Sequence, residues 1–230
     1  MTDFVYQPPT EPWLDIVHRD RDIIVVNKPS GLLSVPGRLH CDSILSRLHA
    51  QEERCYAVHR IDMDTSGLQI EALRRAAERN LHQQFRERKV IKIYVALVEG
   101  RVAEREGHID VPLRRQGGEP PRSMVDPISG KPAQTIFRVL HHFETQTLVL
   151  LKPQTGRSHQ LRVHMRHLGH PIVGDRIYHP SPQAGARLML HAHQLQFEHP
   201  YSQEMIRLSC LPHEADFRQY IQNQGPLNDD

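Results

Sequence analysis

Apolar and polar residues alternate in several short segments of the chain, with the period of two that predicts β-strands. In one such segment Leu68, Ile70 and Ala72 lie on one face. Gln69 and Glu71 lie on the opposite face, which predicts a half-buried antiparallel strand. By the same reasoning we expect strands at residues 14–18, 22–27, 67–72, 91–98, 134–142, 147–152 and 187–197.

A helical period replaces this alternation between residues 73 and 88. Leu73, Ala77, Leu81 and Phe85 recur every four residues and form one apolar stripe. Further helices are expected over residues 158–168 and after Pro212. Because strands outnumber helices and strand–helix–strand alternation is weak, the pattern predicts an α+β fold with a mainly antiparallel sheet and flanking helices.

The positions of proline and glycine predict how the chain is organised. Pro8, Pro9 and Pro12 indicate an extended N-terminal arm over residues 1–13. A single domain is expected over residues 14–220, followed by a C-terminal tail over residues 221–230. The glycine- and proline-rich run from 113 to 132 predicts a mobile loop.

Composition excludes several classes of protein. The formal net charge of the 230 residues is only +2, so any basic surface must be local. The chain lacks both an apolar run of about 18 residues and a signal peptide, which predicts a cytoplasmic protein with no membrane contact. Three cysteines without a C-x-x-C pair indicate neither a disulfide framework nor a thiolate metal site. We expect a monomer.

The densest polar segment is VHRIDMDTSG, residues 58–67. It carries two carboxylates, an arginine and a histidine between two apolar stretches, and loops on rigid sheets commonly hold active sites. The alternative is that Asp62 or Asp64 only caps a turn that the following Thr-Ser-Gly completes. These residues alone leave both interpretations open.

A second polar segment, residues 155–178, holds four arginines against the single acid Asp175. At helical spacing His159, Arg162 and Arg166 share one face, which would point toward an anion. The opening T-G-R-S directs backbone amides and Arg157 to one place, which suits a phosphate or a carboxylate. The alternative is a solvated basic face.

Other chemistries lack their motifs. The 17 histidines match neither H-E-x-x-H nor a Cys/His finger, so we expect no metal. The sequence also lacks G-x-G-x-x-G, Walker and G-x-S-x-G patterns, which disfavours a nucleotide cofactor and a serine hydrolase. We therefore expect no cofactor.

Four motifs together resemble the RluA family of pseudouridine synthases. They are V-N-K-P-S-G-L, H-R-I-D-x-x-T-S-G, K-x-Y-x-A-x-V and T-G-R-x-H-Q-L-R-V-H-x-x-x-x-G-H-P-I-x-G-D, in the family's order over about residues 13–217. The resemblance implies the pseudouridine synthase catalytic fold, a mainly antiparallel mixed sheet with flanking helices and a central cleft. It leaves no room for an S4-type RNA-binding domain. The segments EPWLDIVHRD, KPSGLLSVPGR and AAERNLHQQFRER look closest to dual-specificity members that act on 23S rRNA and tRNA.

The resemblance also implies roles for single residues. Asp62 matches the catalytic aspartate, Tyr94 the active-site tyrosine and Arg157 their basic partner. As an alternative, Tyr94 is simply a tyrosine of the core. Asp64 departs from the family pattern, as do Gln69 and Glu71 in a strand that is usually more apolar in the family.

The target base must leave its stack for a carboxylate to reach its sugar. Arg60 stands two residues from Asp62 and could fill the gap left by the base. The expected RNA-binding residues are Arg60, Arg75, Arg79, Arg86, Arg162 and Arg166.

We therefore predict an isomerase that acts on specific uridines of structured stem-loops, with 23S rRNA and the tRNA anticodon stem-loop as its RNA partners. The alternatives are a synthase with a single rRNA or tRNA substrate, or a non-catalytic RNA-binding module. A glycoside-type hydrolase using Asp62 and Asp64 would need its two carboxylates about 5 to 10 Å apart across a sugar.

Overall fold

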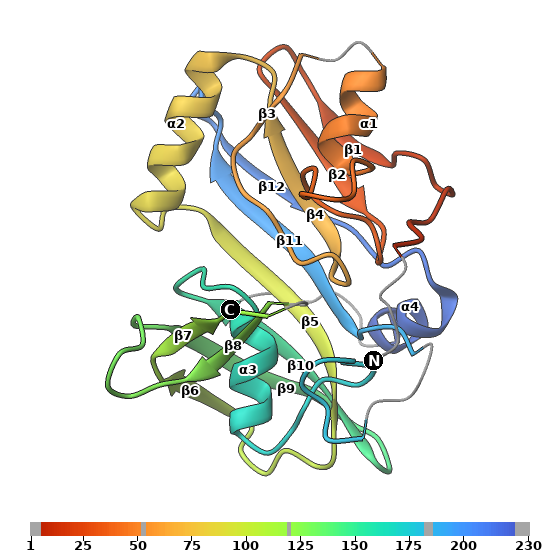
Figure 1. The fold of residues 1–230 in the computed structure, drawn as a ribbon, viewed down its shortest axis with the longest axis vertical. Helices are drawn as coiled ribbons and strands as arrows, with labels where there is room; N and C mark the ends of the chain where they lie inside the picture. Colours follow the sequence, from red (N-terminus) through yellow and green to blue (C-terminus); the bar gives the residue numbers. More distant parts are fainter. Residues whose placement is uncertain (1–5, 52–53, 119–120, 182–185, 224–230) are drawn as a thin grey trace. The chain divides into compact units, whose positions relative to one another are not determined.

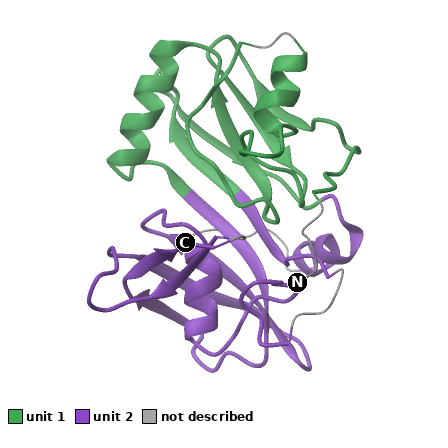
Figure 2. Ribbon diagram, in the orientation of Figure 1, with its two compact units in different colours: residues 1–91, 194–212 green, residues 92–193, 213–230 purple. Residues whose placement is uncertain are grey.

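The computed structural model describes residues 6–51, 54–118, 121–181 and 186–223. The chain divides into two compact units (Figure 2): unit 1 contains residues 1–91 and 194–212, and unit 2 contains residues 92–193 and 213–230. Strands β5 (Ile91–Glu99) and β11 (Leu190–Glu198) each contain residues of both units. Unit 1 is therefore completed by residues that follow most of unit 2 in the sequence.

Unit 1 is built on strands in the order β1, β2, β4 and β11, with β3 paired to β4 and β12 paired to β11. Strands β2 and β4 are antiparallel, and their register runs from Ile23 opposite Ala72 to Lys28 opposite Gly67. The strands (Figure 1) are β1 (Ile16–Arg19), β2 (Ile23–Lys28), β3 (Tyr56–Ala57), β4 (Ser66–Ala72) and β12 (Met205–Ser209).

Two helices flank these strands, α1 (Ile44–Ala50) and α2 (Arg75–Arg86). Alternate residues of β2 pack into different clusters: Ile24 joins the cluster that contains α1, and Ile23 joins the cluster that contains α2. Successive side chains of a strand point to opposite faces, so the two helices cover opposite faces of the sheet.

Strand β4 is buried along its whole length, which contradicts the predicted half-buried strand. Gln69 and Glu71 are 0% exposed, because helix α1 covers the face that the sequence pattern assigns to solvent. The alternation was identified correctly, but the environment of its polar face was not.

Unit 2 contains strands in the order β5, β10 (Gln146–Pro153), β9 (Gln134–His142) and β6 (Glu106–Asp110). β11 is the neighbour of β5 on its other side. The N–H of Leu97 in β5 donates to the carbonyl of Met189, the residue just before β11, at 3.1 Å. Its helices are α3 (Gln160–His167) and α4 (Ala215–Gln222). Val149 of β10 and Met165 of α3 belong to one apolar core cluster, so α3 packs on this sheet.

A separate hairpin, β7 (Leu113–Gln116) and β8 (Arg122–Val125), lies where the sequence predicted a mobile loop, so that prediction is wrong for these residues. Leu113 pairs with Val125 and Gln116 with Arg122. Most of β7 is exposed and polar, so the strand carries little apolar alternation.

The predicted fold class is confirmed, with a mixed α+β structure and a mostly antiparallel sheet. The other predicted strands correspond to β1, β2, β5, β9, β10 and β11, and the predicted helices to α2, α3 and α4. Helix α1 was not predicted, and it begins at a capping box between Ser43 and Ser46. The short strands β3, β6 and β12 were also missed.

Part of the predicted N-terminal arm is attached to unit 1. The Arg47 guanidinium donates to the carbonyls of Pro9 at 2.7 Å and Trp13 at 3.0 Å, and the Tyr6 hydroxyl donates to the carbonyl of Asp42 at 2.8 Å. Residues 1–5 of the arm and 224–230 of the tail lie outside the described residues. The division of the chain at residues 13 and 220 stays a prediction.

The three cysteines are free thiols. Within the described ranges, no helix combines the length and the apolar character that crossing a bilayer requires.

Candidate active site

The segment that carries Asp62 connects β3 to β4 in unit 1, and side chains from the segment after β2 hold its backbone. The Ser34 hydroxyl donates to the carbonyl of Ile61 at 2.8 Å and accepts from the N–H of the same residue at 3.1 Å. The Ser30 hydroxyl donates to the carbonyl of Asp64 at 2.7 Å. The backbone is therefore fixed on both sides of Asp62.

Lys28 makes the central connection between these two segments. Its side chain is 0% exposed, and its ammonium donates to the carbonyls of Pro29 at 3.0 Å, Leu32 at 2.6 Å and Met63 at 2.8 Å. The N–H of Gly31 also donates to the carbonyl of Met63, at 2.9 Å. A buried ammonium needs such acceptors, so Lys28 ties the K-P-S-G segment to the residue that follows Asp62.

Strand β4 holds the other end of the segment. The Glu71 carboxyl accepts a hydrogen bond from the N–H of Val58, and the N–H of Ile70 donates to Nε2 of His59 at 3.0 Å. The His59 ring stacks on Phe85 of α2, with 4.7 Å between ring centroids. Burial raises the pKa of Glu71 to about 8, against the opposing hydrogen bonds from Gln69 and Val58.

Between these anchors the segment presents its polar side chains. Asp62 and Asp64 are half-buried, and Arg60 is exposed. The N–H of Thr65 donates to the backbone carbonyl of Asp62 at 3.1 Å and closes the turn. The turn is therefore closed by a backbone hydrogen bond from Thr65, one of the residues that the alternative interpretation expected to complete it.

Tyr94 lies in the part of β5 that belongs to unit 2, opposite Leu151 of β10. It is half-buried and packs against the core cluster that contains Ala96 and Val98 of the same strand face. Lys92 is two residues earlier, and burial lowers the pKa of its ammonium. Tyr94 thus combines contact with the core with a partly accessible side chain.

Arg157 is presented by a hydrogen-bond network around Gln160, the first residue of α3. The Gln160 amide oxygen accepts from the N–H of Arg157 at 3.0 Å and from the Thr155 hydroxyl at 2.6 Å. Its amide nitrogen donates to the carbonyl of Gln134 at 2.9 Å. The guanidinium of Arg157 is exposed, and its Nε donates to the carbonyl of Pro132 at 3.0 Å.

Arg162 was predicted to contact RNA, and the structure contradicts this. It is 2% exposed, and its Nε and Nη2 each donate to an oxygen of Asp175 at 2.7 Å. Burial acts to raise the pKa of Asp175, but the bonds from Arg162 outweigh it and hold the pKa below its ordinary value. Breaking such a buried pair would be costly, so Arg162 has a structural role.

The predicted shared face of His159, Arg162 and Arg166 is also wrong. His159 caps α3 with a φ of 55°, outside the helical conformation, and its Nδ1 lies 2.7 Å from the Tyr178 hydroxyl. Arg166 remains exposed near the end of α3.

Arg75, Arg79 and Arg86 are exposed on α2, whose opposite side buries Ala77 and Leu81. Arg75 donates to Glu78 at 2.8 Å and lies 4.0 Å from the centroid of the Tyr56 ring. Its charge is therefore partly matched within unit 1. RNA contact by Arg60, Arg75, Arg79, Arg86 and Arg166 stays a prediction.

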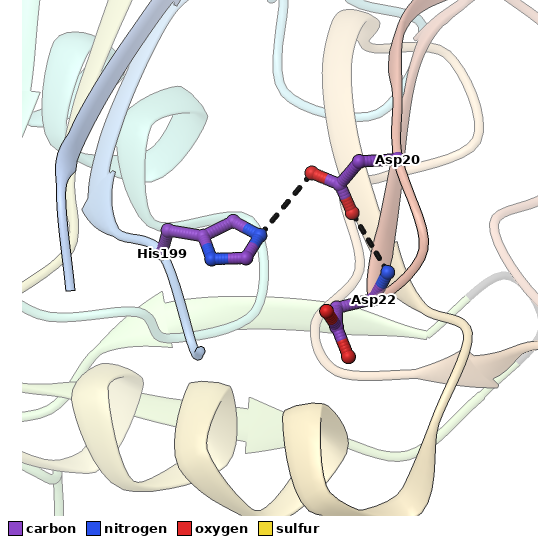
Figure 3. Close-up of side chains that lie close together, drawn as sticks. All are labelled: Asp20, Asp22 and His199. Atoms are coloured by element: carbon purple, nitrogen blue, oxygen red, sulfur yellow. Dashed lines mark hydrogen bonds and ion pairs between the residues drawn. The ribbon is translucent and has the colours of Figure 1, made fainter. Parts of the chain in front are cut away.

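Asp20, Asp22 and His199 bring possible metal-ligand atoms within 4.8 Å of one another (Figure 3). His199 Nδ1 accepts from the N–H groups of Tyr201 at 3.2 Å and Ser202 at 3.0 Å, which leaves the hydrogen on Nε2. That nitrogen donates to Asp20 at 3.2 Å, and the other Asp20 oxygen accepts from the N–H of Asp22 at 2.7 Å (Figure 3). Hydrogen bonds account for this arrangement, which ties the turn after β1 to the turn after β11.

Residues 22–167 match the family model for RNA pseudouridylate synthase, and the chain belongs to this family of isomerases. The family resemblance seen in the four motifs is thereby confirmed. Among curated relatives, the dual-specificity RNA pseudouridine synthase RluA of Pasteurella multocida (strain Pm70) is 50% identical, with coverage of 90% of this chain and 97% of the relative. RluA of Escherichia coli (strain K12) is 53% identical, with coverage of 85% and 91%.

Solved structures agree with this assignment. The human RNA pseudouridylate synthase domain containing 1 has a TM-score of 0.72 and 30% identity, with coverage of 94% of this chain and 96% of that chain. The human RNA pseudouridylate synthase domain containing 4 has a TM-score of 0.74 and 25% identity, with coverage of 93% and 95%.

The residues that support the site were not predicted from the sequence. Lys28, Ser30, Ser34 and Gln160 all stand inside the quoted motifs or directly beside them, and that position was the available signal. Their types are ordinary for turns and surfaces, so nothing in the pattern distinguished a buried anchor from a solvated side chain.

Proposed function

We propose that this protein isomerises uridine to pseudouridine in RNA with Asp62 as its catalytic carboxylate. The observation that carries the proposal is the anchoring of the backbone at Ile61, Met63 and Asp64, which surround Asp62. Catalysis requires a group held in a productive geometry, and rigid support of the backbone provides this.

The proposed reaction breaks the bond between C1′ and N1, turns the uracil and joins C1′ to C5. The proton on C5 then leaves and N1 takes up a proton, so that the net change is an isomerisation. The Asp62 carboxylate either attacks C1′ or removes the C2′ proton, and each role needs its negative charge. As the family motifs imply, Tyr94 would stack on the uracil and place its hydroxyl near C5, and Arg157 would supply the basic group of the reaction. None of these steps needs a redox agent.

The target nucleotide must be extruded from its stack, which costs a few kcal/mol. Arg60 is exposed two residues before Asp62, and a guanidinium can stack where a base has left and pair with a phosphate. We propose that Arg60 occupies the gap.

The names of the two RluA relatives describe them as dual-specificity enzymes. At about 50% identity over most of both chains, we propose dual specificity for this protein too, with stem-loops of 23S rRNA and tRNA as substrates. We place this activity in the cytoplasm and assign it to a monomer.

The test of the catalytic assignment is Asp62→Asn. The amide keeps the shape of the side chain but lacks its charge, so isomerisation should fall by roughly a thousandfold or more while RNA binding persists. Tritium release from RNA containing 5-tritiated uridine measures turnover, and a filter or anisotropy assay measures binding.

Asp64→Asn is the matched control, because it removes a half-buried carboxylate two residues away. It should change turnover only mildly. Turnover of Asp62→Asn within tenfold of the wild type would remove Asp62 from the mechanism. Binding without turnover by the wild type would instead favour a non-catalytic RNA-binding module.

A further inference from the structure

A pocket of about 410 Å³ lies entirely within unit 2, between the β7–β8 hairpin and the T-G-R segment before α3. Its polar lining includes four cationic side chains and three hydroxyls. Among them are Arg114, Arg115, Lys131, Arg157, Ser129 and Ser158.

The charge of this lining is largely uncompensated. Arg114 forms an ion pair with Asp126 on the hairpin. In the described part of the chain, Arg115, Lys131 and Arg157 form no ion pair with a carboxylate, and all three side chains are exposed. Three cations converging on one hollow repel one another, so an anion bound there would be stabilised.

The walls of the pocket are held in place by neighbouring bonds. Leu113 and Lys131 exchange both backbone N–H to carbonyl bonds, each at 2.9 Å. The Asp126 carboxylate accepts from the N–H of Ser129 at 2.9 Å, and the N–H of buried Ser123 donates to the Tyr178 hydroxyl at 2.7 Å. The cations therefore project from a fixed frame, which lowers the entropy lost on binding.

The chemistry of the lining selects the ligand. Guanidinium forks, an ammonium and hydroxyls are the groups that bind phosphate oxygens in protein–nucleic acid interfaces. Among the described residues, the lining has one apolar side chain, Leu113, and no aromatic ring on which a base could stack. This favours the sugar–phosphate backbone over a base.

We propose that this pocket binds one backbone phosphate of the substrate RNA, through Arg115 and Lys131 together with Arg157. The inference deepens the proposed function, since it rests on RNA being the substrate. Arg157 belongs to both sites, so a phosphate held beside it would fix the position of the RNA strand relative to the T-G-R segment.

The first test measures RNA binding by the full chain carrying Asp62→Asn, so that turnover does not alter the substrate. Adding Arg115→Gln and Lys131→Gln should weaken binding by about tenfold or more. The slope of log K against log salt should fall in magnitude by about 1, the value for one lost phosphate contact.

Arg105→Gln is the matched control, because it removes an exposed cation of unit 2 that does not line the pocket. It should leave the slope unchanged. Thermal unfolding should show equal melting temperatures, since all three substituted side chains are exposed. An unchanged slope in the folded double variant would overturn the proposal.

The second test locates the phosphate. Binding is measured for stem-loops that each carry a single neutral methylphosphonate linkage. At one position the neutral linkage should weaken binding to the Asp62→Asn parent but not to the variant that also carries Arg115→Gln and Lys131→Gln. A scan in which every linkage affects both proteins equally would overturn the assignment.

Competition by inorganic phosphate distinguishes binding of free phosphate from binding of a phosphate of the RNA backbone. Millimolar phosphate should compete with RNA for the parent and not for the double variant. Phosphate binding accompanied by an unchanged RNA salt slope would overturn the assignment to RNA. The binding arms do not need turnover, so failure of isomerisation by the wild type would defeat the proposed function and leave this test decisive.

Discussion

Glu71 is a carboxyl group buried between a helix and the anchored segment that carries Asp62. Gln69 donates to its Oε1 at 2.5 Å, and its Oε2 has no partner among the described residues. Burial with one oxygen unpartnered disfavours the charged form of the carboxyl, in agreement with a pKa of about 8.

The ionisation of Glu71 should make stability depend on pH. Its pKa is raised from 4.5 to about 8 by burial, so the unfolded chain releases this proton first as the pH rises. The contribution of protonated Glu71 to the free energy of unfolding is complete below about pH 4.5. Between about pH 4.5 and about pH 8 this contribution declines by at most about 1.4 kcal/mol per pH unit. Glu71→Gln removes the decline and should become more stable than the wild type toward pH 8.

Urea unfolding at pH 5, 6, 7 and 8 measures this difference. Glu204→Gln, at an exposed position of unit 1, should show no such trend. A constant difference between Glu71→Gln and the wild type across that range would show that Glu71 ionises normally.

At this scale, the sequence could identify the two polar residues of β4 but not their environment. Alternation looks the same whether the polar face meets water or another element. The covering helix α1 has only seven residues, too few for a helical period to stand out, and so the buried acid was assigned to solvent.

At the scale of elements, the segment after β2 acts as a support for the one before β4. Ser34 is 4% exposed and makes two bonds to the backbone of Ile61. Ser34→Ala would leave a buried N–H and a buried carbonyl without this partner, at a cost of about 1 to 3 kcal/mol. We expect that loss in unfolding free energy, together with a lower kcat and a nearly unchanged KM for RNA, because Asp62 rather than the RNA surface is loosened.

Ser202→Ala removes an exposed hydroxyl of the same unit and should alter neither the unfolding free energy nor kcat. Unfolding in urea and single-turnover tritium release provide the two measurements. If KM rises while kcat stays at the wild-type value, the segment positions RNA instead of the carboxylate.

The four motifs were sufficient to predict the family and to select Asp62, Tyr94 and Arg157 for testing. They did not separate exposed from structural residues. Arg162 and Arg166 are the same residue type on one helix, yet only Arg162 meets the buried Asp175. That difference depends on the loop after α3, which local periodicity does not describe.

For the whole molecule, a net charge of +2 means that RNA must be held by local groups of cations. Short stem-loops that can be remodelled around such groups are suitable substrates, and different loops can reach one bound shape. We expect the purified protein to modify a minimal tRNA anticodon stem-loop and a minimal 23S rRNA hairpin.

Mapping pseudouridine in both RNAs after incubation measures this. Modification of only one, with both folded, would indicate a single-substrate synthase. An Asp62→Asn sample treated in parallel shows whether the signal depends on this enzyme rather than on a contaminant.

The discontinuity of unit 1 has a consequence for synthesis on the ribosome. Strand β4 is flanked by β2 and β11, but β11 belongs to the far end of the sequence. While unit 2 is being translated, the part of β4 that β3 does not pair remains an open edge, the kind of edge that pairs with other chains. Closing it requires a contact of long sequence separation, which is slow to form. The polar pair Gln69 and Glu71 lies on that strand, and before burial these two side chains would make its edge less prone to aggregate than an apolar strand.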